Sequence, residues 1–157
     1  MGWHELYLRF VEEKEKRINI YVQGAVFETQ IQNFRGQLEI APTNPFVIND
    51  LKRLMGKYDQ WVKERDDENA RFITLIDELT LRFKDSSEFN EIMKTVSVKP
   101  FGGYDVKEPT KEDFRDREAW IKWIEQANAS KNEFLDHKLK QPLQKLATYL
   151  QKKSKVE

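Results

Sequence analysis

An apolar repeat over residues 44–84 constrains the fold of this chain more than any other feature. Its members are Val47, Leu51, Leu54, Tyr58, Trp61, Phe72, Leu75 and Leu79. They recur at alternating spacings of three and four, and the same register crosses a polar gap where it falls on Arg65 and Glu68. A mean period of 3.5 residues is typical of a helix that buries one seam against other helices. We therefore expect helical structure over about residues 45–84.

The start of this helical region is well marked, but its continuity is open. Asn44 is a good N-cap residue, and Pro45 suits the first helical position because its missing N–H has no partner there anyway. Residues 63–69 (KERDDEN) are entirely polar, and Asp66 or Asp67 could cap a second helix. The pattern therefore allows one long helix or two antiparallel helices joined near residues 65–69.

The N-terminal third changes its periodicity. Trp3, Leu6, Tyr7, Phe10 and Val11 share one side of a short amphipathic helix over residues 3–16. From residue 17 to 40 the apolar residues instead alternate with polar ones, as in a half-buried strand, and glycines 24 and 36 supply turn signals. We expect a small antiparallel β-meander over about residues 17–40, packed on the central helix or helices.

This stretch, RINIYVQGAVFETQIQNFRGQLEI, resembles the first part of an Sm-like fold of the bacterial Hfq kind. A charged helix leads into an Ile-Tyr strand, a glycine turn, a second strand ending in Gln-Ile-x-x-Phe, and a third strand. The resemblance implies a small barrel that oligomerises into an RNA-binding ring. Residues 42–83 depart from that family because they read as helical where the last strands should follow, and no lysine–histidine motif is present. We carry over no site residue.

The C-terminal half is expected to be helical with one long loop. Residues 85–87 (Asp-Ser-Ser) should end one helix and cap the next, which is short. Residues 97–110 lack a helical pattern. Within them, Val98 and Phe101 could add a strand, and glycines 102 and 103 could form a hinge. Thr110 with Asp113 forms a capping-box variant that opens the next helix. That helix should end at Asn128-Ala129.

A last helix should begin at Ser130, which forms a capping box with Glu133, and Pro142 should kink or split it. The predicted fold is therefore α+β and mainly helical, in a single domain of residues 1–157. Its expected parts are a helix plus meander (1–43), central helices (44–96), a loop (97–110) and a C-terminal helical pair (111–153).

Composition excludes several classes of protein. The chain has no cysteine, which removes disulfides, zinc–thiolate sites and thiol nucleophiles. Its 27 basic and 27 acidic residues give a formal net charge of zero, whereas dedicated nucleic-acid binders usually carry a basic excess. No apolar run is long enough to span a bilayer, and the N-terminus lacks the apolar core of a secretory signal. We expect a soluble cytoplasmic protein that does not bind membranes.

The motifs of common enzymes and cofactor sites are missing. There is no glycine-rich nucleotide loop, HExxH or EF-hand pattern, and the two histidines, His4 and His137, lie far apart in sequence. Asp66, Asp67 and Glu68 are adjacent on a helix and point in different directions, so we expect a solvated bend or N-cap. We therefore predict no catalytic residue, no metal ligand and no cofactor.

The leading hypothesis is a non-catalytic protein–protein interaction module, such as an adaptor, inhibitor or complex subunit, that binds a partner or itself. The candidate interface residues are Trp120, Trp123, Tyr58 and Trp61, since tryptophan and tyrosine are enriched at interface hot spots. The alternative is nucleic-acid binding through the meander and the basic C-terminal segment. Its candidate contacts are Tyr21, Arg35, Lys138, Lys145, Lys152 and Lys153.

Overall fold

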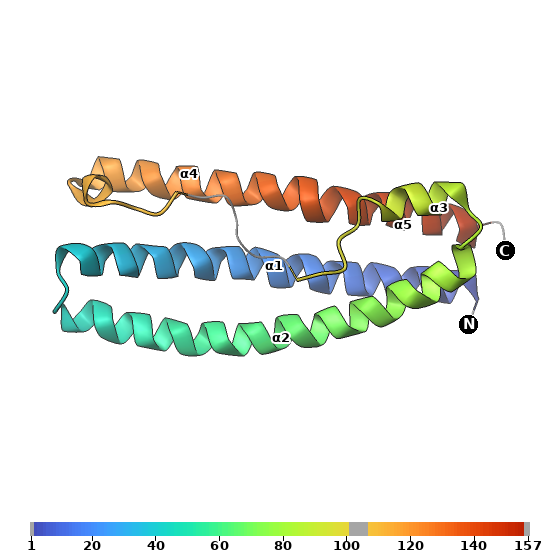
Figure 1. Cartoon of the computed structure of the whole chain (residues 1–157), viewed down its shortest axis with the longest axis horizontal. Helices are drawn as coiled ribbons and strands as arrows, with labels where there is room; N and C mark the ends of the chain where they lie inside the picture. The colour runs from blue at the N-terminus through green and yellow to red at the C-terminus, as the bar shows by residue number, and fades with distance from the viewer. Residues whose placement is uncertain (1, 101–106, 156–157) are drawn as a thin grey trace. The chain divides into compact units, whose positions relative to one another are not determined.

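The computed structural model describes residues 2–100 and 107–155, and every regular element within these ranges is helical. The elements, labelled in Figure 1 where there is room, are α1 (Trp3–Ile40), α2 (Pro45–Phe83), α3 (Ser87–Met93), the 3₁₀ turn η1 (Lys111–Phe114), α4 (Arg117–Leu135), the π-helical turn η2 (Asp136–Lys140) and α5 (Gln141–Ser154). No helix in the described part of the chain is both long and apolar enough to cross a membrane.

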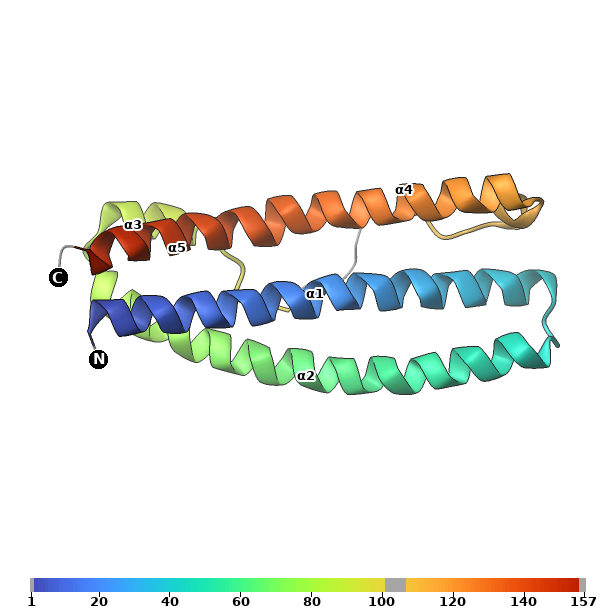
Figure 2. The ribbon, with the colours of Figure 1, turned by 180° about the vertical axis from the view of Figure 1, so that it is seen from behind.

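The described residues form two compact units, each with its own core. Unit 1 contains residues 2–21, 64–100 and 135–155, and unit 2 contains residues 22–63 and 107–134. The buried apolar residues of unit 1 include Leu6, Phe10, Tyr21, Phe72, Leu75, Leu79, Phe83, Phe89, Leu139, Leu143, Leu146, Tyr149 and Leu150. Those of unit 2 are Ala25, Ile31, Val47, Leu54, Trp61, Trp123 and Ala127. The helices α1 and α2 contribute a segment to each unit (Figure 2).

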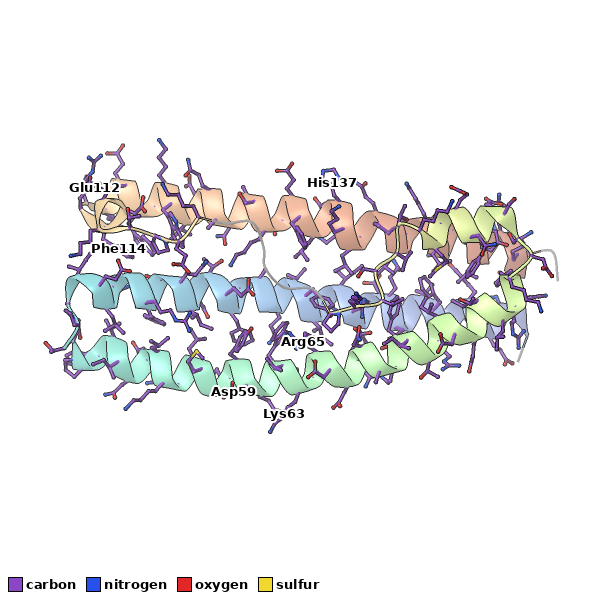
Figure 3. All side chains as sticks on the ribbon, viewed as in Figure 1. Asp59, Lys63, Arg65, Glu112, Phe114 and His137 are labelled. Atoms are coloured by element: carbon purple, nitrogen blue, oxygen red, sulfur yellow. The ribbon has the colours of Figure 1, made fainter. Side chains whose placement is uncertain are left out.

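Helix α2 is a single helix, so the hairpin alternative is excluded. The Asn44 side chain accepts hydrogen bonds from the backbone N–H groups of Phe46 (3.0 Å) and Val47 (3.4 Å), which confirms the predicted cap. Six members of the apolar repeat are buried, and Leu51 and Tyr58 are half-buried. The outer face carries exposed residues such as Asp59 and Lys63 (Figure 3). The seam is therefore used to fold the chain.

The predicted β-meander is wrong, because residues 17–40 continue α1 without interruption. The residues that α1 buries around this point are Arg17, Tyr21, Gly24 and Ala25. Their spacings of four, three and one are helical, whereas the alternating Val22 is exposed and Ile18 and Ile20 are only half-buried. Tertiary packing thus overrides the strand propensity of the β-branched residues. The resemblance to Sm-like proteins is therefore wrong too, because the strands that it required are part of a helix.

The two glycines predicted to form turns instead allow close packing inside α1. A Cβ atom at Gly24 would overlap the ring of Trp61, and one at Gly36 would overlap the ring of Phe114. Phe114 belongs to η1, whose position is shown in Figure 3. Small residues at these points let a large aromatic ring from another element of unit 2 lie directly on the helix backbone.

The predicted boundary at Asn128–Ser130 is also wrong, because α4 runs through it to Leu135. The Thr110–Asp113 capping box is present, and the Thr110 N–H donates to Asp113 Oδ2 at 2.7 Å. This box opens η1 and not the following α-helix. Near the start of α4, Asp116 Oδ1 accepts the Ala119 N–H at 2.7 Å.

Pro142 lies at the second position of α5, directly after the π-helical turn η2. A proline donates no backbone hydrogen bond, and the widened turn accommodates it without ending the helical path.

The predicted re-cap at residues 85–87 is confirmed, because Ser86 Oγ accepts the backbone N–H of Phe89 at the start of α3. Residues 97–100 and 107–110 have no regular structure, so Val98 extends no strand. The predictions for Phe101 and for a hinge at glycines 102 and 103 lie outside the described residues.

The close approach of Gly24 and Trp61 can be tested by comparing two glycine substitutions. Gly24→Ala should lower the free energy of unfolding by about 1–2 kcal/mol, because the overpacking penalty outweighs the gain in helix propensity. Gly56→Ala is the control, since nothing lies within 4 Å of a Cβ atom there. It should raise stability by up to ~1 kcal/mol. Chemical denaturation followed by circular dichroism measures both changes, and equal stabilisation by both substitutions would contradict the packing described.

Candidate functional site

The structure places all four candidate interface residues in unit 2 and buries two of them. Trp61 and Trp123 are only 4% and 6% exposed, while Tyr58 and Trp120 are half-buried. The Trp61 ring packs on Gly24 and stands 5.4 Å from the ring of Tyr58. Trp61 and Trp123 therefore act as core residues in this fold, and Trp120 and Tyr58 keep partial access to solvent.

Trp120 and Trp123 form one stack with Phe114. The ring centroids of Phe114 and Trp120 are 4.4 Å apart, and those of Trp120 and Trp123 are 4.9 Å apart with the planes inclined by 10°. The indole N–H of Trp123 donates to the carbonyl oxygen of Lys107 at 3.0 Å. The stack holds η1 and residues 107–110 against α4, so its first role is to order this segment.

The candidate nucleic-acid contacts belong to both units, and one of them is buried. Tyr21 is fully buried beneath the Arg17 guanidinium, at 5.3 Å from carbon to ring centroid, so it presents no ring to a base. Arg35 is exposed in unit 2. The four lysines, Lys138, Lys145, Lys152 and Lys153, are exposed in unit 1. Lys152 lies 3.4 Å from Glu88, and the Lys153 ammonium lies 5.5 Å from the Tyr149 ring centroid.

A surface that was not predicted from the sequence lies at the turn between α1 and α2 in unit 2 (Figure 1). We call residues 40–46, IAPTNPF, the apolar tip. Five of these seven residues are apolar, six of the seven are exposed, and none is charged. Phe46 is 79% exposed and Ile40 is 51% exposed. Isolated exposed apolar residues are common on proteins, but a contiguous group of them indicates an interaction surface.

The backbone of the apolar tip is firmly held. The turn is closed by the Asn44 N–H, which donates to the carbonyl oxygen of Ala41 at 3.2 Å, and the Asn44 cap fixes the first turn of α2. Prolines at positions 42 and 45 restrict the backbone further. Such a turn presents its side chains at a small entropic cost on binding. A signal was available in the sequence, since apolar residues fill a connector that would ordinarily be polar.

Unit 1 contains a buried polar cluster centred on Arg17. Its side chain is fully buried, and Nη1 donates to Glu68 Oε1 at 2.8 Å and to Asn69 Oδ1 at 3.0 Å. Nη2 donates to the carbonyl oxygens of Ser97 at 3.3 Å and Lys99 at 3.1 Å. One guanidinium therefore joins α1, α2 and the segment after α3. The Phe72 ring, 4.1 Å from the guanidinium carbon, adds a cation–π contact.

Two carboxyl groups, those of Glu13 and Glu68, are buried next to each other in this cluster. Burial is the main reason that the pKa of Glu68 is raised to about 7; Arg17 opposes the shift, and the neighbouring carboxyl group of Glu13 adds to it. Glu13 Oε1 lies 3.4 Å from Arg71 Nε. Among the described residues, neither that atom nor Glu68 Oε2 accepts a hydrogen bond. A proton held between the two carboxyl groups would satisfy both oxygens.

Unit 2 contains a buried lysine. Lys131 is 2% exposed, and its Nζ atom donates to Thr29 Oγ1 at 2.9 Å and to the Ala25 carbonyl oxygen at 3.2 Å, which ties α4 to α1. Burial lowers the pKa of Lys131 to about 8, although Glu28, whose carboxylate lies 3.8 Å away, partly offsets the shift. Burial in turn raises the pKa of Glu28. The two hydrogen bonds and the nearby Glu28 carboxylate compensate for burying the Lys131 ammonium.

No candidate metal centre emerges from the described ranges. They contain no group of three or more histidine, cysteine or acidic residues that could hold a metal ion. His4 and His137 are both exposed, and Figure 3 shows His137 on η2. Asp66 and Asp67 are exposed as expected, but Glu68, which the sequence assigned to the same solvated bend, is fully buried.

The raised pKa of Glu68 predicts a pH-dependent stability. The folded state binds a proton more tightly than the unfolded state, so the stabilisation is complete below the ordinary pKa of 4.5 and is lost as the pH rises through about 7. Between pH 5 and pH 8 the wild-type protein should therefore lose about 2 kcal/mol of stability relative to Glu68→Gln. Urea denaturation at both pH values measures this difference.

Glu78→Gln is the matched control, since that carboxylate is bonded to Arg9 in the same unit but its side chain is 44% exposed. It should leave the pH dependence of stability over this window as in the wild type. A constant stability difference between the wild type and Glu68→Gln from pH 5 to pH 8 would show that burial does not raise the pKa of Glu68 in the folded state.

Lys131 predicts a change of the opposite sign at alkaline pH. Its pKa is depressed in the folded state, so the unfolded state binds more protons between about pH 8 and 10.5, and stability rises with pH there. From pH 7 to pH 10 the wild type should gain about 2 kcal/mol relative to Lys131→Met. A stability difference that does not change with pH would show that Lys131 is not buried as a cation.

Comparison with known proteins places the chain in no family. No protein-family model matches it, no significant match is found among curated proteins, and none is found among solved structures. Functional inference therefore depends on the chain's own surfaces.

Proposed function

We propose that this chain is a non-catalytic protein–protein interaction module that contacts its partner through the apolar tip. The observation that supports this most directly is the 79% exposure of Phe46 beside Ile40, on a turn without charged residues. An exposed aromatic ring on a rigid turn can fill an apolar pocket of another protein and act as a hot spot. A cytoplasmic location remains a prediction from the cysteine-free sequence.

The surface proposed here differs from the seam expected from the sequence. The apolar repeat of α2 is buried within the chain, and Trp61 and Trp123 are core residues. Trp120, half-buried in its aromatic stack, is kept as a secondary contact. Nucleic-acid binding stays a prediction, and of its candidate contacts Tyr21 is buried.

The proposal can be tested by affinity capture of the tagged full chain from its native host, with quantitative mass spectrometry. Phe46→Ser should reduce recovery of the specific partner, or of an untagged second copy of this chain, by about tenfold or more, because hot-spot residues contribute 2 kcal/mol or more. Folding should be little affected, since the Phe46 side chain is mostly in solvent. Trp120→Ala should have a smaller effect on capture.

Leu81→Ser is the matched control, because Leu81 is a comparably exposed apolar residue, at 74%, on unit 1 of the same helix. It should leave recovery unchanged. The proposal is refuted if Phe46→Ser and Leu81→Ser behave alike, or if no protein is recovered specifically with the wild-type chain.

A further inference from the structure

Unit 1 carries a groove that is separate from the apolar tip of unit 2 and has a distinct charge pattern. Helices α3 and α5 lie side by side (Figures 1 and 2) and enclose an open groove of about 720 Å³. Ile92 and Tyr149 line the groove. Glu88 and Glu91 belong to α3, whereas Lys145 and Lys152 belong to α5, so the two walls carry opposite charges.

The walls of this groove are fixed by packing beneath them. The Tyr149 hydroxyl lies 2.8 Å from Ser86 Oγ, at the cap of α3. The rings of Phe83, Phe89 and Tyr149 form a cluster with centroid separations of 5.3–6.0 Å. Phe89 and Tyr149 are almost completely buried. A groove with rigid walls is prepared for a ligand, because little conformational entropy remains to be lost on binding.

We propose that the α3/α5 groove binds an amphipathic helix of a partner protein that has acidic residues along one flank and basic residues along the other. A helix fits because two neighbouring helices offer ridges and grooves that a third helix can fill with an apolar stripe. Complementary charge selects the flanks: the partner's basic side lies along Glu88 and Glu91, and its acidic side lies along Lys145 and Lys152.

The wall charges already interact across the groove in the free protein. Lys152 lies 3.4 Å from Glu88, and both side chains are more than half exposed. Exposed ion pairs of this kind contribute ~1 kcal/mol or less, so a partner's charges can replace the pair at little cost. A helix of uniform charge would meet one wall of like charge, which disfavours it.

The test uses a displayed library of helical peptides of about 15 residues, with leucine fixed along one stripe and glutamate or lysine randomised on both flanks. The wild-type chain should enrich peptides with one acidic and one basic flank. The variant Glu88→Lys/Glu91→Lys should enrich peptides with two acidic flanks, and Lys145→Glu/Lys152→Glu should enrich peptides with two basic flanks. Each mismatched flank should weaken binding about fivefold at low salt, measured by fluorescence anisotropy.

Phe46→Ser is the control that separates this inference from the proposed function, because it alters the apolar tip and leaves the groove intact. It should bind the enriched peptides as the wild type does. Retention of no helical peptide, or flank charges that do not follow the wall substitutions, would overturn the inference while leaving the capture result for the apolar tip unaffected. If Phe46→Ser does not reduce capture of the partner but the peptides still bind, only the proposed function is refuted.

Discussion

The buried guanidinium of Arg17 is the interaction on which unit 1 depends most. Within 3.3 Å its two terminal nitrogens reach a carboxylate and an amide of α2 and two carbonyl oxygens after α3. Removal of this one side chain would leave Glu68 buried without its cation and two carbonyls without their donor, and such losses typically cost several kcal/mol. Packing alone could bring the helices together, but these directional bonds set which residues of α1 and α2 face each other.

The success and the failure of sequence-based prediction have the same physical origin. The α2 seam repeats over nine turns, and few other structures could bury it, so its helix and its cap were predictable. Residues 17–40 contain short runs that satisfy both periods. The alternation of Ile18, Ile20 and Val22 suggested strands. The fold instead buries Tyr21 and Gly24, because the residues that pack on them are far away in sequence. Local patterns cannot reveal those partners.

The candidate sites were harder to predict from the sequence than the fold. The register of the seam does place Glu68 on the inner face, yet nothing local indicates that its cation is Arg17, 51 positions away. Without that partner a charged residue is better assigned to solvent, as the sequence suggested. The apolar tip was missed for another reason. Phe46 lies directly before Val47, the first buried member of the repeat, and the local sequence does not show that its side chain is left exposed.

The two proposed surfaces differ in chemistry, and this difference argues for different partners. The apolar tip is convex, uncharged over residues 40–46 and dominated by one aromatic ring, so it requires an apolar pocket on the other protein. The α3/α5 groove is concave and has walls of opposite charge, so it requires a convex partner with segregated charges. Specificity in this chain is therefore expected from shape and charge.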